Sequence, residues 1–444
     1  MLYSIPPQVN KAISLLNEAG FSAYVVGGAV RDLVMEKTPH DWDITTSAKP
    51  EETERIFASY RLIETGIKHG TVTVLLNSMP LEITTYRTEG DYSDRRRPDS
   101  VSFSDDILDD LSRRDFTCNA LAYNPGKGII NEYNGLEDIK SNLIRCVGNP
   151  DTRFNEDALR IMRALRFASV LGFDIDKDTA DSIRRNYTLL EHISEERIFS
   201  ELIKLLCGKN AGKILREFSE VFFFIIPELS PMKGCEQHHE RHIYDVWEHS
   251  VTALENINPD GAMRMAMLLH DSGKPRVKSE DENGVNHFYD HAVVSAEIAD
   301  DVLRRFKSSN NFRREVVNLI KYHGFLPHEI TKKTYKRYIG TLGLDTVKKL
   351  FDVREADLRA QNPVFLSEAL ETNETGKRIF DEIIRDEPCF AIKDLAVDGR
   401  DLMKLGFEAS HTLGSTLEKL LDEVMDGKIK NEKSALIERA KELL

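Results

Sequence analysis

Two short stretches near the N-terminus carry residues that can hold phosphate and metal ions. An apolar run at 24–26 ends at Gly27 and Gly28, after which a helical pattern begins. Adjacent glycines let backbone N–H groups approach an anion, and a helix start adds its positive dipole end, which predicts a phosphate seat. Asp41 and Asp43 follow in a strand pattern that places both carboxylates on one face, where they can hold Mg²⁺. An ordinary turn and a solvated strand end are the alternatives for each stretch alone, but the two together favour the functional interpretation.

A second set of charged residues lies further along the chain, where Asp157, Arg160, Arg163 and Arg166 recur at three-residue steps. Such a row winds slowly around one side of a helix, with apolar residues between its members supplying the packing faces. A solvated face with ion pairs is the alternative.

The functional interpretation of this row is the recognition of a base. A carboxylate at Asp157 accepts and a guanidinium at Arg160 donates, which matches an amino donor beside a ring-nitrogen acceptor. Cytosine and adenine both present that edge. Uracil and guanine present the reverse order, which leaves buried groups unpaired at roughly 1–3 kcal/mol each. Arg163 and Arg166 then remain for the triphosphate or the RNA end.

The second half of the chain contains histidines and aspartates in helical patterns. They are His249, His270, Asp271, His291, His323 and Asp357. Imidazole and carboxylate together suit a borderline transition metal, and an open coordination position activates water. A lone histidine is an ordinary surface or core residue, so the interpretation depends on the set.

Composition sets the broad class of the protein. The chain has 444 residues and a net charge of −14, which argues against non-specific coating of nucleic acid, although local patches can still grip it. No stretch predicts a transmembrane span or a secretory signal, so we expect a cytoplasmic protein with no membrane partner. The five cysteines show no metal-binding spacing and are expected to be reduced, mostly buried thiols.

The pattern of elements predicts an α+β fold. Strand patterns at 24–26, from residue 41 onward, at 71–76 and at 81–86 indicate a small mixed sheet with helices, the last two forming a hairpin. Residues 88–104 are polar and rich in turn formers, which predicts a mobile loop. Residues 107–123 are predicted helical with an interruption near 112–115. From about residue 151 we expect nearly continuous helix, closing with an amphipathic helix at 411–444, and the patterns specify no oligomeric state.

Over residues 20–360 the sequence resembles the class II tRNA nucleotidyltransferase/poly(A) polymerase family, and most of all the bacterial CCA-adding enzymes that carry an HD domain. The motifs that carry the resemblance are Gly27-Gly28-Ala-Val-Arg31-Asp32, Asp41-Trp-Asp43, Leu81-Glu82-Ile-Thr-Thr-Tyr-Arg87, Arg113-Arg114-Asp115-Phe-Thr-Cys-Asn119-Ala and Glu156-Asp157-Ala-Leu-Arg160-Ile-Met-Arg163-Ala-Leu-Arg166. Breaks in the pattern near 148–150, 227–234 and 362–363 give the domain boundaries. With the resemblance they predict a polymerase-β-like head at 1–148, a helical neck with a base-reading helix at 149–230 and an HD domain at 231–362. Residues 363–444 are expected to form a helical tail that contacts tRNA or packs against the chain.

The resemblance also implies roles for these residues. Asp41 and Asp43 would bind Mg²⁺, with Glu82 as a third carboxylate or an exposed strand residue. The nucleotide contacts would be Gly27, Gly28, Arg31, Arg114, Asp157, Arg160, Arg163 and Arg166. The implied reaction is CCA addition to the 3′ end of tRNA, taking CTP and ATP, by two-metal nucleotidyl transfer. A-only addition and poly(A) synthesis stay open as alternatives.

The histidine and aspartate set resembles the HD phosphohydrolase superfamily. By that resemblance His249, His270, Asp271 and Asp357 are the primary ligands of a divalent transition metal. His291 and His323 would be auxiliary or part of a second metal position. An intact motif favours a working phosphohydrolase. A phosphohydrolase whose N-terminal half only binds RNA is the alternative from another functional class.

Overall fold

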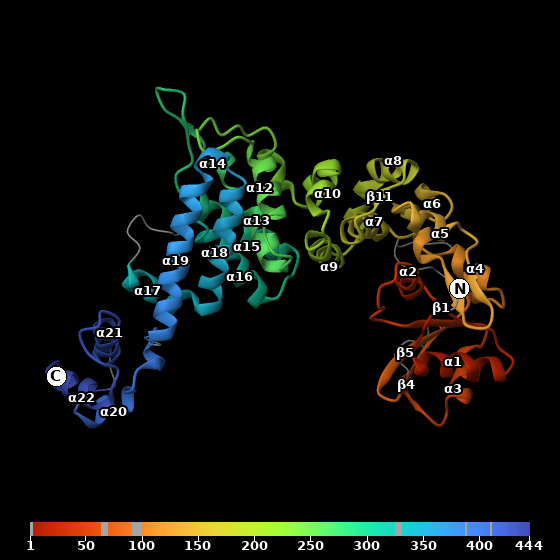
Figure 1. Cartoon of the computed structure of the whole chain (residues 1–444), viewed down its shortest axis with the longest axis horizontal. Helices are drawn as coiled ribbons and strands as arrows, with labels where there is room; N and C mark the ends of the chain where they lie inside the picture. The colour runs from red at the N-terminus through yellow and green to blue at the C-terminus, as the bar shows by residue number, and fades with distance from the viewer. Residues whose placement is uncertain (1–2, 64–69, 91–99, 325–330, 387–388, 409–410) are drawn as a thin grey trace. The chain divides into compact units, whose positions relative to one another are not determined.

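The computed structural model of the chain describes residues 3–63, 70–90, 100–324, 331–386, 389–408 and 411–444. The chain divides into two compact units, Met1–Pro227 and Glu228–Leu444 (Figure 1). The fold is α+β as predicted, because the first unit holds a mixed sheet and helices make up most of the remainder.

The sheet of the first unit has seven strands in the order β3-β4-β5-β2-β1-β8-β9. They are β1 (Ala23–Val26), β2 (Asp43–Thr46), β3 (Arg61–Ile63), β4 (Thr71–Leu76), β5 (Met79–Thr85), β8 (Ala122–Asn124) and β9 (Gly128–Ile130). β2 runs parallel to β5 and antiparallel to β1. The central strands bury Val25, Ile44 and Ile83, while helices α1 (Pro7–Glu18) and α3 (Pro50–Ile56) pack against the sheet (Figure 1).

The predicted hairpin is confirmed, and its turn is two residues long. Asn77 and Ser78 have φ of 49° and 67°, the positive values that two-residue hairpin turns require. Beyond the hairpin, β6 (Arg87–Glu89) pairs antiparallel with β7 (Val101–Phe103). The loop predicted at 88–104 thus begins and ends in paired backbone, and its residues 91–99 lie outside the described residues.

The helix predicted over 107–123 is wrong in its second half. α4 covers only Ile107–Ser112, a 3₁₀ turn follows at Thr117–Asn119, and β8 then joins the sheet beside β1. The misassigned residues are all buried, so neither helical nor strand periodicity is visible in their sequence. Their pairing with β1 decides the conformation.

Helices dominate after residue 150, as predicted, but the expected row at 157–166 is interrupted. The helices of this part are α6 (Pro150–Glu156), α7 (Leu159–Leu171), α8 (Lys177–Asn186), α9 (Glu195–Leu206), α10 (Ala211–Glu217) and α11 (Ser219–Ile225). Asp157 has extended backbone (φ −135°, ψ 103°) and lies between α6 and α7 instead of within one helix. A short parallel pair, β10 (Leu143–Ile144) with β11 (Asp174–Ile175), also departs from the all-helical expectation.

The second unit is built from helices and one small hairpin. The helices are α12 (Val246–Glu255), α13 (Gly261–Leu269), α14 (Lys274–Val277), α15 (His291–Arg305), α16 (Asn310–Lys321), α17 (Lys332–Leu342), α18 (Leu344–Arg359) and α19 (Leu366–Asp386). The hairpin pairs β12 (Ser279–Glu280) with β13 (Asn286–His287). Among the described residues, no helix has the length and hydrophobicity needed to cross a membrane.

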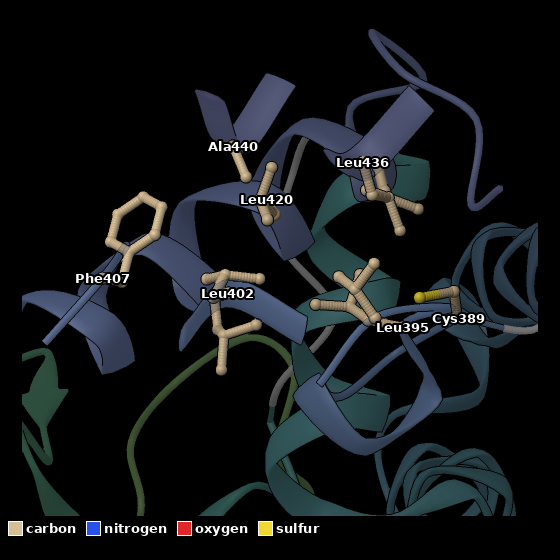
Figure 2. Close-up of a cluster of buried hydrophobic side chains, with 10 residues drawn as sticks. Cys389, Leu395, Leu402, Phe407, Leu420, Leu436 and Ala440 are labelled. Atoms are coloured by element: carbon tan, nitrogen blue, oxygen red, sulfur yellow. The ribbon is translucent and has the colours of Figure 1, made fainter. Parts of the chain in front are cut away.

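The closing helix predicted at 411–444 is two helices, α21 (His411–Met425) and α22 (Lys433–Lys441), with α20 (Gly399–Lys404) before them. The break falls at Gly427, whose φ of 71° is a left-handed conformation that ends a helix. A cluster of buried side chains that includes Leu402, Leu420 and Leu436 holds the three helices together (Figure 2).

We expect Leu420→Ala to destabilise this cluster by about 2–5 kcal/mol, since it removes a fully buried side chain and leaves a cavity. Hydrogen exchange of the full chain should show faster opening of residues 389–443. Leu444→Ala is the control, because that side chain is 68% exposed. Equal protection in both variants would contradict the proposed cluster.

Candidate active site and candidate metal centre

The predicted carboxylates meet at one end of the sheet. Asp43 on β2 and Glu82 on β5 are register partners in the parallel pair, and Asp41 lies just before β2. Partial desolvation raises the pKa of Asp43, and Glu82 and Asp41 raise it further against the opposing effect of Arg114. Three carboxylates that repel one another while facing solvent form a group that a cation would stabilise. The neighbourhood expected for Glu82 is therefore confirmed.

Gly27 lies where the phosphate seat was predicted. Its φ is 71°, and a Cβ on it would lie 3.0 Å from Nη1 of Arg114, so a side chain here would crowd that guanidinium. Arg114 in turn donates from Nη2 to Oδ2 of Asp110 at 3.0 Å. Burial alone would raise the pKa of Asp110, but Arg114 and Arg113 hold it below its ordinary value. Arg114 is thus held in position beside the backbone of Gly27.

Arg31 belongs to a buried network that connects the start of α2 (Gly28–Val34) with α7. Its Nη1 donates to Oδ1 of Asn119 at 2.8 Å, and its Nη2 donates to Asp32 at 2.7 Å. Asn119 donates from Nδ2 to Oδ1 of Asp115 at 3.2 Å. Asp115 also accepts two bonds on Oδ2 from Arg163, at 2.9 and 2.6 Å.

Asp157 has each carboxylate oxygen in a hydrogen bond. Oδ1 accepts from the backbone N–H of Leu159 at 3.0 Å, and Oδ2 accepts from Nη2 of Arg197 on α9 at 3.2 Å. Each oxygen can accept a further bond, so the carboxylate keeps capacity for a base while its orientation is fixed. The break between α6 and α7 leaves this acceptor outside the helices.

The three arginines of the row differ in exposure. The side chain of Arg160 is 9% exposed, that of Arg166 is 14% exposed and that of Arg163 is 35% exposed. Arg160 donates to Glu156 and to the backbone carbonyls of residues 113 and 153. Arg166 pairs with Glu201, and its guanidinium lies 3.8 Å from the ring centre of Phe167.

Sequence reasoning assigned no role to five residues that hold this site in place. They are Asp110, Asp115, Asn119, Arg197 and Glu201. The first three lie in or near a motif that was already singled out. Arg197 and Glu201 are four residues apart on α9, a spacing that indicates only a shared helix face.

In the second unit, four histidine rings are oriented in the same way. Nδ1 of His249, His270, His291 and His323 lies 2.7–3.2 Å from a backbone carbonyl oxygen. A carbonyl only accepts, so each Nδ1 donates, and in a neutral ring Nε2 is then free to bind a metal.

Asp271 lies between two pairs of these rings. Its Oδ2 is 3.4 Å from Nε2 of His249 and 3.3 Å from Nε2 of His270. Its Oδ1 is 3.4 Å from Nε2 of His291 and 3.9 Å from Nε2 of His323. The geometry therefore offers two adjacent metal positions that share one carboxylate.

Asp357 on α18 completes the first position, with Oδ1 2.9 Å from Nε2 of His249 and 3.7 Å from Nε2 of His270. Burial alone would lower the pKa of His270, but Asp271 and Asp357 raise it to about 10. Burial and the nearby His270 lower the pKa of His323 to about 4. The four imidazoles and the two carboxylates of this set match the ligands of a borderline divalent metal.

Comparisons with known proteins match nearly the whole chain. The "Poly A polymerase head domain" model matches residues 23–145, the "Probable RNA and SrmB-binding site of polymerase A" model matches 172–232, and a "tRNA nucleotidyltransferase domain 2" model matches 279–440. The CCA-adding enzyme of Ligilactobacillus salivarius is 36% identical over 99% of this chain and 98% of its own. The CCA-adding enzyme of Lactobacillus helveticus is 36% identical over 96% of this chain and 94% of its own.

Among solved structures, that of the Bacillus stearothermophilus CCA-adding enzyme in complex with CTP is 29% identical, with a TM-score of 0.74 over 99% of this chain and 98% of that one. The Thermotoga maritima CCA-adding enzyme complexed with tRNA is 22% identical, with a TM-score of 0.56. The match covers 98% of this chain and 95% of that one, and it shows a shared fold.

We expect the full-length protein to retain Mn²⁺ or Co²⁺ after dialysis, and His270→Ala to weaken that binding more than about a hundredfold. Loss of an outer hydrogen bond to a ligand alone costs about 10–100-fold, and here a ligand itself is lost. Atomic emission on the dialysed protein measures the metal. His411→Ala is the control, because this exposed histidine lies outside the cluster. Wild-type metal content in His270→Ala would contradict the assignment.

Proposed function

The chain belongs to the family of CCA-adding enzymes, and we propose that it adds C, C and A to the 3′ end of tRNA from CTP and ATP. The observation that carries the proposal is the meeting of Asp41, Asp43 and Glu82 at one end of the sheet, beside Arg114. Curated relatives at 36% identity over nearly the whole chain are CCA-adding enzymes, and a solved relative binds CTP.

The carboxylates fit Mg²⁺, because this ion binds hard oxygen ligands. Its positive charge would also offset the repulsion between the neighbouring carboxylates. Asp41 and Asp43 would hold it, with Glu82 completing the acidic edge. Bound Mg²⁺ supplies activation of the terminal tRNA hydroxyl and charge neutralisation for the departing pyrophosphate.

The positive groups of the chain position the nucleotide. Arg114, held by Asp110 against Gly27, and Arg31, held by Asn119, carry positive charge at the start of α2. They stabilise the triphosphate oxygens and keep the α-phosphate in line with the tRNA hydroxyl, so that the protein contributes position and electrostatics. Arg163, the most exposed arginine of the row, is placed to contact the triphosphate or the RNA end.

Base selection falls to Asp157 and Arg160. The carboxylate accepts from the exocyclic amino group of cytosine or adenine, and the guanidinium donates to the neighbouring ring nitrogen. Arg197 keeps the carboxylate in one orientation through its bond to Oδ2. Uracil and guanine would face like groups at both positions and are rejected.

Nucleotide incorporation on two tRNA substrates tests the proposal and its nearest alternatives. A tRNA lacking all three terminal residues should gain C, C and A and then stop. Extension only of a tRNA that already ends in CC, by one A, would indicate an A-adding enzyme. Long A tails would indicate a poly(A) polymerase.

Asp43→Asn should lower the incorporation rate by about a thousandfold or more. Removing a metal-binding carboxylate forfeits several kcal/mol of charge stabilisation, and each ~1.4 kcal/mol corresponds to tenfold in rate. Single-turnover CMP incorporation is the measurement, with exposed Asp105→Asn as the control. Activity within a few-fold of wild type would remove Asp43 from the proposed site.

Asp157→Asn should reduce selection of C and A over U and G. The amide presents a donor where the base offers its own donor, at a cost of about 1–3 kcal/mol for the unpaired group, or roughly 5–150-fold. Competitive incorporation of the four nucleotides reports the ratio. Asp178→Asn on α8, an exposed carboxylate of the same unit, is the matched control. An unchanged ratio in Asp157→Asn would mean that another residue selects the base.

The second unit supports a second candidate function. We propose that it hydrolyses phosphate esters at a divalent transition metal held by His249, His270, Asp271 and Asp357, with His291 and His323 at the adjacent position. The carrying observation is the shared Nδ1-to-carbonyl orientation of four rings around Asp271. The metal supplies activation of water when bound.

The metal-free His270→Ala variant should lose phosphoester hydrolysis and keep nucleotide incorporation.

A further inference from the structure

We propose that Arg241, His242 and Arg354 form the phosphate-binding side of the metal centre in the second unit, with Arg354 as its main positioning residue. These three residues received no role in the assignments above. The inference rests on the proposed phosphohydrolase function, and it names the groups that would orient the ester.

The first observation concerns the guanidinium of Arg354. Arg354 lies on α18 three residues before Asp357, on the same face of the helix, although no ion pair within 4.0 Å joins them. Burial lowers the pKa of Arg354, and the carboxylate of Asp357 opposes that effect. Its Nε is buried and has no hydrogen-bond partner among the described residues. Arg359, on the same helix, instead donates from Nε and Nη2 to Glu355 at 3.0 and 2.8 Å. Arg354 therefore holds a positive charge next to the metal ligands with no carboxylate paired to it within the described chain.

Arg241 is the second observation. It contacts the ring of Phe365, with the guanidinium carbon 5.3 Å from the ring centre, and its carbonyl accepts from the N–H of Asn362 at 2.8 Å. No described carboxylate forms an ion pair with it. Burial is the main cause that lowers the pKa of Arg354, and the charge of Arg241 lowers it further. Two nearby guanidiniums repel each other, so an anion between them would lower the free energy of the arrangement.

His242 is the third observation. Its ring lies against His249, with ring centres 5.3 Å apart and planes at 87°. Nδ1 of His242 is buried and has no partner among the described residues. The ring borders the metal ligands without sharing their orientation toward a carbonyl, so it is free to serve as a hydrogen-bond partner of a bound group.

Charged groups of both signs surround the metal centre, and Lys274 Nζ lies 2.7 Å from Oδ2 of Asp271. Asp271 and Asp357 lie with the histidine ligands, whereas Arg241, His242 and Arg354 supply the positive and polar border on the Asp357 side. A phosphate ester suits both parts, because its oxygens bind a metal on one side and a planar guanidinium on the other. A role for Arg354 only in holding Asp357 is disfavoured, because Gln361 already donates to Oδ2 of that carboxylate at 3.2 Å.

The test is calorimetric titration of inorganic phosphate into the full-length protein, both metal-free and loaded with Mn²⁺. Arg354→Gln should weaken binding about 10–100-fold at unchanged metal content, because a charge-assisted bond is lost. Arg354→Lys should recover part of the affinity, and Arg359→Gln, the matched control, should leave it unchanged. Arg241→Gln, on an exposed loop residue, provides a second variant should Arg354→Gln not fold. All the variants leave the first unit unchanged, so differences in phosphate affinity between them come from the second unit.

A larger KM for 4-nitrophenyl phosphate with little change in kcat for Arg354→Gln supports a binding role. Affinity for phosphate equal to wild type in both glutamine variants overturns the inference, and so does loss of metal from Arg354→Gln, which would assign the residue to Asp357. Wild-type protein that binds no metal refutes the phosphohydrolase function separately. The metal-free titrations then decide, since weaker phosphate binding by Arg354→Gln supports the anion site and equal binding overturns it.

Discussion

The arrangement of the first site depends on the buried carboxylate of Asp115. Burial alone would raise its pKa, but Arg163 and Asn119 hold it below its ordinary value. Hydrogen bonds connect Asp115 through Asn119 to Arg31 at the glycine turn. A hydrogen bond from Arg163 connects Asp115 to helix α7. Removing Arg163 or Asn119 would leave this buried carboxylate without a compensating partner. Hydrogen bonds therefore join the glycine turn and helix α7 in one charged network.

The two sites concentrate charge by different means. In the first, Asp43 and Glu82 come together because β2 and β5 run parallel in register, and solvent reaches them. In the second, His270 and Asp271 are almost fully buried between helices. Open carboxylates suit a hydrated, hard ion such as Mg²⁺, whereas a dry imidazole and carboxylate cage suits a borderline metal with few waters. Each unit thus has the ligand chemistry that its expected reaction requires.

Local patterns predicted much of this structure because they reflect local physics. The glycine turn and the hairpin follow from φ preferences, which a short sequence specifies. The approach of Glu82 to Asp43 depends on the parallel pairing of β2 with β5, which is not local. The strand at 122–124 was missed because a fully buried run shows no periodicity. The partnership of Arg197 with Asp157 spans 40 residues of chain and depends on how α9 packs, which no local pattern encodes.

The metal centre shows how a tertiary site can still have a local signature. His270 caps α13 and donates Nδ1 to the carbonyl of Met267. His323 follows α16 and donates to the carbonyl of Ile320, again three residues back. Carbonyls at a helix C-terminus lack helical partners, so a histidine placed there is oriented by its own helix and directs Nε2 away from it. Helix packing then has only to bring these preset rings around Asp271. The sequence therefore predicted which residues cluster, but not the distances between them.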